Sequence, residues 1–273
     1  MSMLFAAALA LPQGTGTTLI SSSTATLGAA ASSEPTTLSD PTLPGHTIYL
    51  PANLTAHNPL PVIVWGNGAC SADSTTHHNF LLEVAAWGHI ILVSGEPNAS
   101  GSTTPEMMVE SIDWAVENAG KGDWVKVDAS KIAAAGMSCG GLEAYEQVSD
   151  ERVSAFGIFN SGQFTESSTA EVVKKVKKPI FYFLGGESDI AYENGMRDFE
   201  AVPEGVPTWV GNVDTGHLGT YSQPKGGVYG TAAQHFFRWV LQGDESAAEY
   251  FRGGGAEADG WETDKRNLDK ISA

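Results

Sequence analysis

The feature that most restricts the fold of this chain is a regular alternation of short apolar runs with longer segments of helical periodicity. Most of the apolar runs are continuous, which is typical of strands covered on both faces. They predict strands at His46–Leu50, Pro61–Trp65, His89–Ser94, Lys131–Met137, Ala155–Asn160, Ile180–Leu184 and Thr208–Val213. The intervening segments predict helices at His77–Ala86, Pro105–Asn118, Gly140–Val148, Tyr192–Glu200 and Val228–Gln242. This order predicts βαβ units, and therefore an α/β fold with a mostly parallel central sheet and helices on both faces.

Composition excludes several classes of protein. The chain has 273 residues, of which 42% are hydrophobic, and this is enough apolar surface for one globular domain. Its 15 basic and 32 acidic residues give a net charge of -17, which argues against binding to nucleic acid or to an acidic membrane surface. No run reaches the ~18 apolar residues that a transmembrane helix needs. We therefore expect a globular protein without a membrane span. A monomer is the expected oligomeric state, although composition does not determine it.

The first residues have some features of a secretory signal. Leu4–Leu11 is a short apolar run, and Ala8-Leu9-Ala10 provides the small residues of a cleavage site. The positively charged start of such a signal is missing, because the first basic residue is Lys121. Two Asn-x-Ser/Thr sequons, at Asn53 and Asn98, fit a glycosylated extracellular protein. The sequence thus predicts secretion, with a cytoplasmic location as the alternative if this segment is not a signal.

Three regions are predicted along the chain. Residues 1–42 comprise the signal and a flexible leader rich in Ser and Thr, since residues 14–40 show neither helical nor strand periodicity. Residues 43–252 form the globular domain. Residues 253–273 begin with three glycines and are mostly polar, so we expect a tail in which Trp261–Leu268 forms a late edge segment.

The motif with chemical meaning is Gly136-Met137-Ser138-Cys139-Gly140, a G-x-S-x-G sequence that Gly141 follows at once. It stands between a predicted strand and a predicted helix, which is the context in which this pattern presents a serine hydroxyl above a sheet. The sharp turn crowds its flanking positions, and glycines there let the serine adopt a strained backbone conformation. Ser138 is therefore the predicted nucleophile.

A nucleophilic serine needs a base, and the base needs an acceptor that fixes its tautomer. Asp189 follows one of the later predicted strands, and His217 lies in a loop bracketed by glycines after the next strand. Because the carboxyl ends of parallel strands meet at one edge of a sheet, we expect Ser138, Asp189 and His217 to lie together. Glu187 and Asp214 are the alternative acids. We favour Asp189 because it ends the loop after its strand and precedes a helix.

These residues resemble the α/β-hydrolase superfamily, and the resemblance covers nearly all of His46–Phe251. The chain is most similar to small secreted esterases without a cap domain, of the dienelactone-hydrolase, cutinase-like and polyester-hydrolase kind. It is also similar to fungal hydrolases that share its Gly-Asn-Gly and Gly-Gly-x-Ser-Asp-Ile-Ala patterns. The interval between Asn160 and Ile180 leaves space for a short helix only, which fits an open site without a cap. The resemblance implies a serine esterase that needs no metal or cofactor, in which His217 is the base and then the acid.

The resemblance also implies an oxyanion hole made of two backbone N–H groups. One belongs to Cys139, directly after the nucleophile, and the other to the loop after the strand Pro61–Trp65, where Ala69 is favoured and Cys70 lies one residue away. Since these two loops must converge, we expect a Cys70–Cys139 disulfide across the hole. Two buried thiols without a bond are the alternative.

Residues at the predicted strand ends are candidates for lining the substrate, and these are Phe159, Asn160, Phe164, Tyr192 and Tyr221. An open cleft offers little of the extended binding that peptidases use, so the expected substrate is a small-molecule or extracellular carboxylic ester. A lactonase or an acyltransferase of secondary metabolism would use the same triad. A ligand-binding relative without catalysis is the remaining alternative.

His77 and His78 form a pair that resembles two metal ligands. Adjacent helical residues point in different directions, however, and no cluster of Cys or carboxylate residues completes a site. We expect both side chains at the surface, near the start of a helix.

Overall fold

The computed structural model describes residues 18–21, 34–54 and 59–271. In this part of the chain one 10-stranded sheet has the order β1-β2-β3-β5-β4-β6-β7-β8-β9-β10. The strands are β1 (Thr18–Ser21), β2 (Pro35–Ser39), β3 (His46–Pro51), β4 (Leu60–Gly66), β5 (Ile90–Ser94), β6 (Val127–Met137), β7 (Val153–Phe159), β8 (Ile180–Leu184), β9 (Thr208–Asn212) and β10 (Glu262–Arg266). The helices are α1 (His78–Ala86), α2 (Pro105–Asn118), α3 (Cys139–Tyr145), α4 (Glu166–Val172), α5 (Tyr192–Ala201), α6 (Gly227–Gln242), α7 (Glu245–Arg252) and α8 (Gly255–Ala258).

The central strands β5, β4, β6, β7, β8 and β9 are parallel to one another. Antiparallel strands extend both edges, with β3, β2 and β1 beyond β5 and β10 beyond β9. The predicted α/β fold with a mostly parallel sheet is therefore confirmed. Between β7 and β8 the described chain holds only α4 and the 3-10 turn η4 (Val173–Lys175), which agrees with the expected short helix and with a site without a cap.

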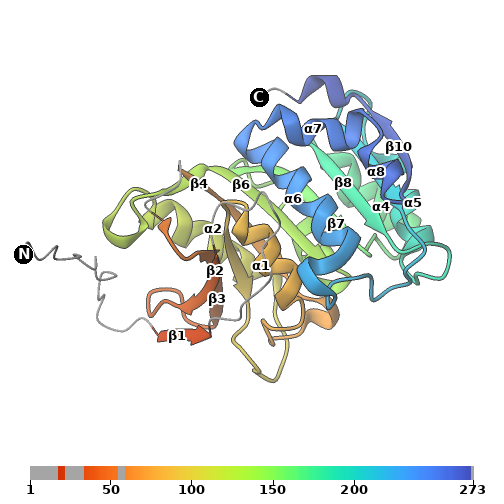
Figure 1. Cartoon of the computed structure of the whole chain (residues 1–273). Coiled ribbons are helices and arrows are strands. Elements are labelled where there is room, and N and C mark those ends of the chain that lie inside the picture. Colours follow the sequence, from red (N-terminus) through yellow and green to blue (C-terminus); the bar gives the residue numbers. More distant parts are fainter. Residues whose placement is uncertain (1–17, 22–33, 55–58, 272–273) are drawn as a thin grey trace, which may run out of the picture.

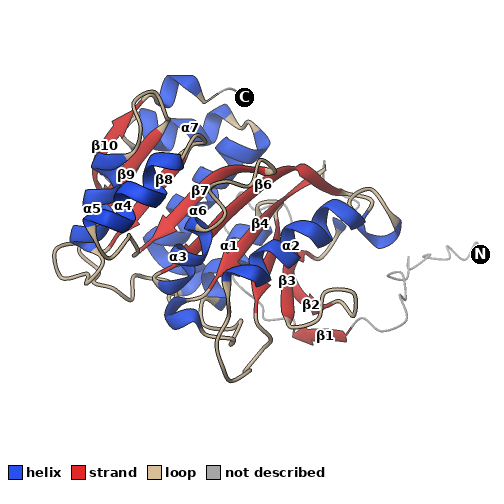
Figure 2. Cartoon of the chain, turned by 180° about the vertical axis from the view of Figure 1, so that it is seen from behind, coloured by secondary structure: helices blue, strands red, loops and turns tan. Residues whose placement is uncertain are grey.

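Helices cover both faces of the sheet. Figure 1 shows α1 and α6 in front of the strands, and Figure 2 shows α2, α3, α4 and α5 on the opposite face. Along β4, Ile63 and Trp65 join the apolar cluster under α1 and α6, whereas Val62 and Val64 join the cluster under α2 and α3. Alternate residues of one strand therefore enter two separate cores, which explains why the predicted strands read as continuous apolar runs.

The sheet extends beyond the strands that the sequence predicts. β2 lies in the segment expected to be a flexible leader, and its residues Pro35 and Thr37 are buried. β10 lies within the expected edge segment of the C-terminal tail, and Trp261 before it is 2% exposed. Edge strands are covered less completely than central ones and therefore carry few apolar residues, which weakens their signal in the sequence. Residues 253–271 therefore contribute buried side chains to the core and do not form a tail outside it.

Two predictions fall partly or wholly outside the described residues. The signal-like run Leu4–Leu11 and its cleavage site are among these, and so is Thr55 of the first sequon. In the second sequon, Asn98 and Ser100 are exposed. Within the described chain, none of the helices is long and apolar enough to cross a membrane.

Candidate active site

The turn between β6 and α3 holds Ser138 in a strained conformation. Its φ is 52° and its ψ is -114°, a region that residues with a side chain rarely adopt and that costs about 1–3 kcal/mol. The surrounding chain fixes it, because the Ser138 N–H donates to the Phe159 carbonyl at 2.9 Å and the Ser161 hydroxyl donates to the Ser138 carbonyl at 2.7 Å. A side chain on Gly140 would approach within 2.0 Å of the Gly66 carbonyl oxygen, so glycine is required there. The sequence pattern thus corresponds to a sharp strand-to-helix turn.

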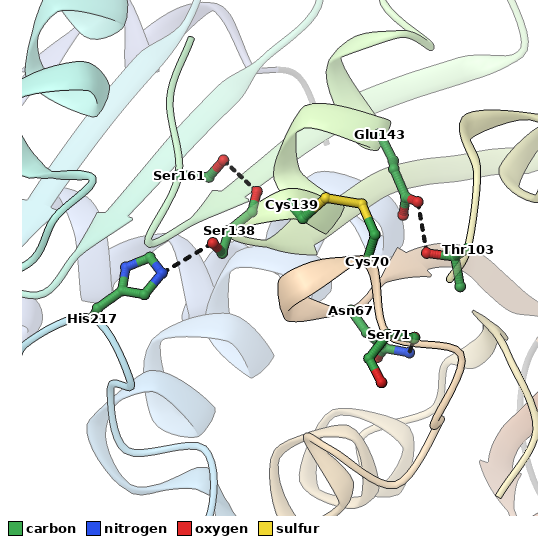
Figure 3. The surroundings of a disulfide bond; sticks show 9 residues. All are labelled: Asn67, Cys70, Ser71, Thr103, Ser138, Cys139, Glu143, Ser161 and His217. Carbon is green, nitrogen blue, oxygen red and sulfur yellow. Dashed lines mark hydrogen bonds between the residues drawn. A yellow bond between two sulfur atoms is a disulfide. The ribbon is translucent and has the colours of Figure 1, made fainter. Parts of the chain in front are cut away.

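Ser138, His217 and Asp189 form one chain of hydrogen bonds at the carboxyl edge of the parallel sheet. His217 Nε2 lies 2.9 Å from Ser138 Oγ, and His217 Nδ1 lies 2.6 Å from Asp189 Oδ1. Figure 3 shows the imidazole facing the serine hydroxyl. The three residues, distant in sequence, are therefore brought together as predicted. Glu187 and Asp214 are exposed, and Asp214 lies near the Ser188 hydroxyl rather than His217.

The Asp189 carboxyl is completely buried and accepts hydrogen bonds on both oxygens. Oδ2 accepts from the Gly185 N–H at 3.0 Å and from Asn160 Nδ2 at 2.8 Å. Oδ1 accepts from the Ala191 N–H at 2.9 Å and faces His217 Nδ1. Backbone N–H groups can only donate, so the carboxyl serves as an acceptor and His217 Nδ1 carries the proton toward it. His217 Nε2 is then free to accept the Ser138 proton, which is the tautomer that a general base requires.

A buried polar network behind Asp189 holds Asn160 in place. Asn160 directly follows β7 and has a φ of 42°, a conformation that Asn tolerates better than most residues. Its side-chain amide donates to Asp189 and to the Tyr229 hydroxyl at 2.9 Å, and its carbonyl accepts from the Tyr221 hydroxyl. Burial raises the pKa of Tyr221 well above its usual value, so this hydroxyl keeps the proton that it donates. Asn160 is thus a second neighbour that orients the carboxylate.

The residues predicted to line the substrate have different positions in the structure. Phe159 is fully buried and stacks on Phe183, and Asn160 and Tyr221 are buried in the network behind Asp189, so the prediction that these three contact substrate is wrong. Strand-end residues point alternately into the core and toward the edge, and the sequence did not show which way these point. Tyr192 is half-buried at the start of α5. Phe164 is 75% exposed and is the one member of this set with a largely free surface.

The turn after β4, Gly68-Ala69-Cys70-Ser71, faces the nucleophile from the other side and is called the Cys70 turn below. The Ser71 N–H donates to the Gly68 carbonyl at 3.1 Å, and both central residues have positive φ, 55° at Ala69 and 47° at Cys70. These are the signs of a type I′ turn, which Gly and Asn usually occupy and which strains Ala and Cys. Among the described residues, no backbone carbonyl outside the helices accepts from the N–H of Ala69 or of Cys139. These two N–H groups are available to a ligand.

A disulfide joins the Cys70 turn to the residue after the nucleophile. Cys70 and Cys139 are bonded, with their Cα atoms 5.1 Å apart, as predicted. Figure 3 shows this bond between the turn and the start of α3. The Asn67 side chain also braces the turn, since it donates to the carbonyls of Ser71 and Ser94, each at 3.0 Å. The two strands that carry these loops pair at Gly66 and Gly136, which brings the loops close.

Sequence reasoning missed a second pair of residues beside this turn. The Thr103 hydroxyl donates to Glu143 Oε1 at 2.6 Å, and the Thr103 N–H donates to the Cys70 carbonyl at 2.7 Å. Both side chains are buried. The sequence carried a weak signal for this pair, namely a glutamate on the short helix that follows the nucleophile.

His77 lies in the core rather than at the surface, so the prediction for it is wrong. It is 3% exposed, and its ring packs edge-on against Trp65 and Tyr221. Burial lowers its pKa to about 4, so the ring is neutral at pH 7. His78 is half-buried, with its Nδ1 3.0 Å from the Tyr49 hydroxyl. Within the described chain, no group of three or more His, Cys, Asp or Glu residues is placed to hold a metal ion.

Comparisons with known proteins add no family assignment to this geometry. No protein-family model matches the chain, and a search of curated proteins found no similar sequence.

Proposed function

We propose that the protein is a serine hydrolase that cleaves carboxylic esters through an acyl-enzyme on Ser138. The observation that carries the proposal is the unbroken hydrogen-bond chain from Ser138 Oγ through His217 to the buried Asp189 carboxylate. A serine hydroxyl bonded to an oriented imidazole can give up its proton as it attacks a carbonyl carbon. The available N–H groups of Cys139 and the Cys70 turn supply the second requirement, which is stabilisation of a developing oxyanion.

In the proposed reaction, Ser138 Oγ forms a bond to the ester carbonyl carbon while His217 Nε2 takes the hydroxyl proton. The carbonyl oxygen becomes an oxyanion, which the N–H of Cys139 and that of Ala69 or Cys70 stabilise. The bond to the alcohol oxygen then breaks, and His217 gives its proton to the leaving alcohol. Water attacks the acyl-enzyme with His217 as base, which releases the acid and restores Ser138.

The surface around this site supports an ester with a large apolar group as the substrate. Phe164 is 75% exposed, while Ile190 and Leu218 are each 80% exposed. Ile190 follows Asp189 and Leu218 follows His217 in the sequence, so two of these side chains belong to the loops that carry the triad. Exposed large apolar residues on the loops that carry the triad are typical of a ligand-binding surface. We expect kcat/KM to rise with acyl length along a series of soluble p-nitrophenyl esters.

Secretion is part of the same proposal. A disulfide persists in oxidising compartments and is rare in the cytosol. The exposed sequon at Asn98 is accessible for glycosylation.

The decisive experiment is labelling with a fluorophosphonate probe, which reacts with an activated serine. The folded protein is expected to carry the label on Ser138, and the label is expected to disappear in Ser138→Ala and after heat denaturation. Ser138→Ala should also reduce ester hydrolysis by about 10,000-fold or more. A folded wild-type protein that neither takes the label nor hydrolyses any ester of the series would refute the proposal and favour a ligand-binding role.

A further inference from the structure

Two separate connections join helix α3 to the Cys70 turn. The first is the Cys70–Cys139 disulfide. The second runs from Glu143 on α3 to the Thr103 hydroxyl, and from the Thr103 N–H to the Cys70 carbonyl. Figure 3 shows the Glu143 carboxyl facing Thr103 on the far side of the disulfide from His217. The second connection is thus parallel to the first and depends on one side-chain hydrogen bond.

The segment that carries Thr103 follows the turn closely. Ser71 and Ser102 form an antiparallel bridge, and the Ala72 N–H donates to the Gly101 carbonyl at 3.1 Å. A shift of Thr103 would therefore move the backbone of the turn with it. Because Ala69 and Cys70 both hold strained positive φ values, the turn needs external restraint to keep its N–H groups aimed at one point.

Glu143 is an unusual residue to bury for packing alone. It is 2% exposed, Oε1 is bonded to Thr103, and Oε2 has no hydrogen-bond partner among the described residues. Burial raises the pKa of the carboxyl, and the neighbouring charge of Glu106 acts in the same direction. Burying such a group costs stability, and the hydrogen bond to Thr103 is the contact that offsets part of this cost.

We infer that Thr103 and Glu143 are positioning residues for the oxyanion hole, which act by fixing the Cys70 carbonyl and thereby the N–H groups of the Cys70 turn. This inference rests on the proposed ester hydrolysis. The side chains touch neither the substrate nor the reacting atoms, and the disulfide restrains the same turn. Loss of the Thr103–Glu143 hydrogen bond therefore has its full effect only when the disulfide is absent as well.

The test uses Thr103→Val, which keeps the shape of the side chain and removes the hydroxyl donor. We expect kcat for a soluble ester to fall roughly tenfold with KM unchanged, since displaced oxyanion donors weaken only transition-state binding. Thr103→Ser retains the donor and should restore kcat. In a background with Cys70→Ala and Cys139→Ala, the same Thr103→Val change should lower kcat by a larger factor than it does with the disulfide present.

The matched control is Thr169→Val. Thr169 is also buried and donates to a buried carboxylate, Asp198, at 2.6 Å, but in the described chain its side-chain hydrogen bonds involve Asp198 and Arg197 and not the Cys70 turn. We expect Thr169→Val to lower the melting temperature about as much as Thr103→Val while kcat stays near wild type. If Thr103→Val is insoluble, Glu143→Met breaks the same hydrogen bond from the other side and should give the same loss of kcat.

Each outcome has one interpretation. Equal loss of thermal stability in the two valine variants, with kcat retained in both, would assign Thr103 a purely structural role and overturn the inference. Additive effects of Thr103→Val and disulfide removal would also overturn it. Ester hydrolysis that survives Ser138→Ala would instead refute the proposed function and the inference with it, whereas hydrolysis abolished by Ser138→Ala with Thr103→Val unaffected refutes the inference alone.

Discussion

The acid–base half of the candidate site, Asp189 and His217, and the oxyanion half, Cys139 and the Cys70 turn, are held by different means. Asp189 is buried and accepts four hydrogen bonds from surrounding groups, so the interior itself fixes its position. The Cys70 turn includes the exposed Ala69 and carries strained backbone, and a covalent bond to Cys139 restrains it. The difference indicates that hydrogen bonds suffice where packing encloses a group, whereas a strained turn near solvent requires additional restraint.

Asp189→Asn is expected to break the acid–base half with the largest effect. The carboxylate accepts on both oxygens, so an amide NH2 at either position faces the N–H of Gly185 or Ala191. At the Oδ1 position it also opposes the His217 Nδ1 proton and favours the wrong tautomer. We expect kcat to fall by about 10,000-fold, as tautomer reversal does in serine hydrolases. Steady-state hydrolysis of a soluble ester measures it.

The exposed acids provide the controls for this prediction. Glu187→Gln and Asp214→Asn change exposed carboxyls, while in the described chain the ring nitrogens of His217 face Asp189 and Ser138, so kcat should stay near wild type. A large loss in either control, with Asp189→Asn still active, would assign the acid to a different residue.

Removing the disulfide is expected to give the next largest effect. In the double variant Cys70→Ala with Cys139→Ala, the Cys70 turn keeps its connection through Thr103, so we expect kcat to fall between about 10-fold and 100-fold rather than to vanish. Loss of a cross-link between residues 69 positions apart also lowers the free energy of unfolding by about 4 kcal/mol. Circular dichroism should show unchanged secondary structure at 25 °C while kcat falls. Undiminished kcat in a fully reduced protein would show that the covalent bond does not restrain the oxyanion half.

Tyr221→Phe tests whether the acid–base half depends on its hydrogen-bond network. The change removes the donor to the Asn160 side-chain carbonyl and leaves that oxygen buried without it, at a cost of about 1–3 kcal/mol. Because Asn160 in turn orients Asp189, we expect kcat to fall by up to about tenfold together with the melting temperature. Tyr250→Phe, which removes the hydrogen bond from a buried tyrosine to Asp259, is the matched control and should leave kcat near wild type. A lower melting temperature with full kcat would restrict Tyr221 to a structural role.

The sequence predicted the parts of the site that local chain geometry determines. The strand-turn-helix pattern around Ser138 is encoded by glycines that a side chain would block, and these are visible without a structure. The order of strands then located Asp189 and His217 at the same edge of the sheet, and the convergence of two loops predicted the Cys70–Cys139 bond. In each case the local segment requires a particular type of residue at one position, and this residue is visible in the sequence.

What the sequence did not predict depends on contacts between distant segments. Asn160 and Tyr221 looked like substrate contacts because they follow strands, but whether such residues point outward depends on what packs beside them. His77 became buried because Trp65 and Tyr221 enclose it, and none of these residues is close to the others in sequence. The Thr103–Glu143 hydrogen bond joins residues 40 positions apart and has no motif. The strand β2 was missed because edge pairing needs little apolar surface, whereas β10 falls within the edge segment expected at Trp261–Leu268.

The smallest expected effect concerns a difference between the buried carboxyls of the two halves. Asp189 accepts on both oxygens, whereas Glu143 has one donor and, within the described residues, a buried oxygen without a partner. Burial, and then the nearby charge of Glu106, raise the pKa of Glu143, so ionisation costs more in the folded protein than in the unfolded chain, where glutamate titrates at about pH 4.3. The stability contributed by the protonated form is fully present below that pH and is lost as pH rises through the folded-state pKa.

Glu143→Gln keeps an acceptor for Thr103 and cannot ionise, so its melting temperature relative to wild type should be higher at pH 8 than at pH 4. Glu117→Gln, an exposed glutamate on α2, should give no such difference between the two pH values. An equal difference in melting temperature between Glu143→Gln and wild type at the two pH values would contradict this prediction. It would mean that the fold stabilises the ionised Glu143 carboxylate, as it does that of Asp189.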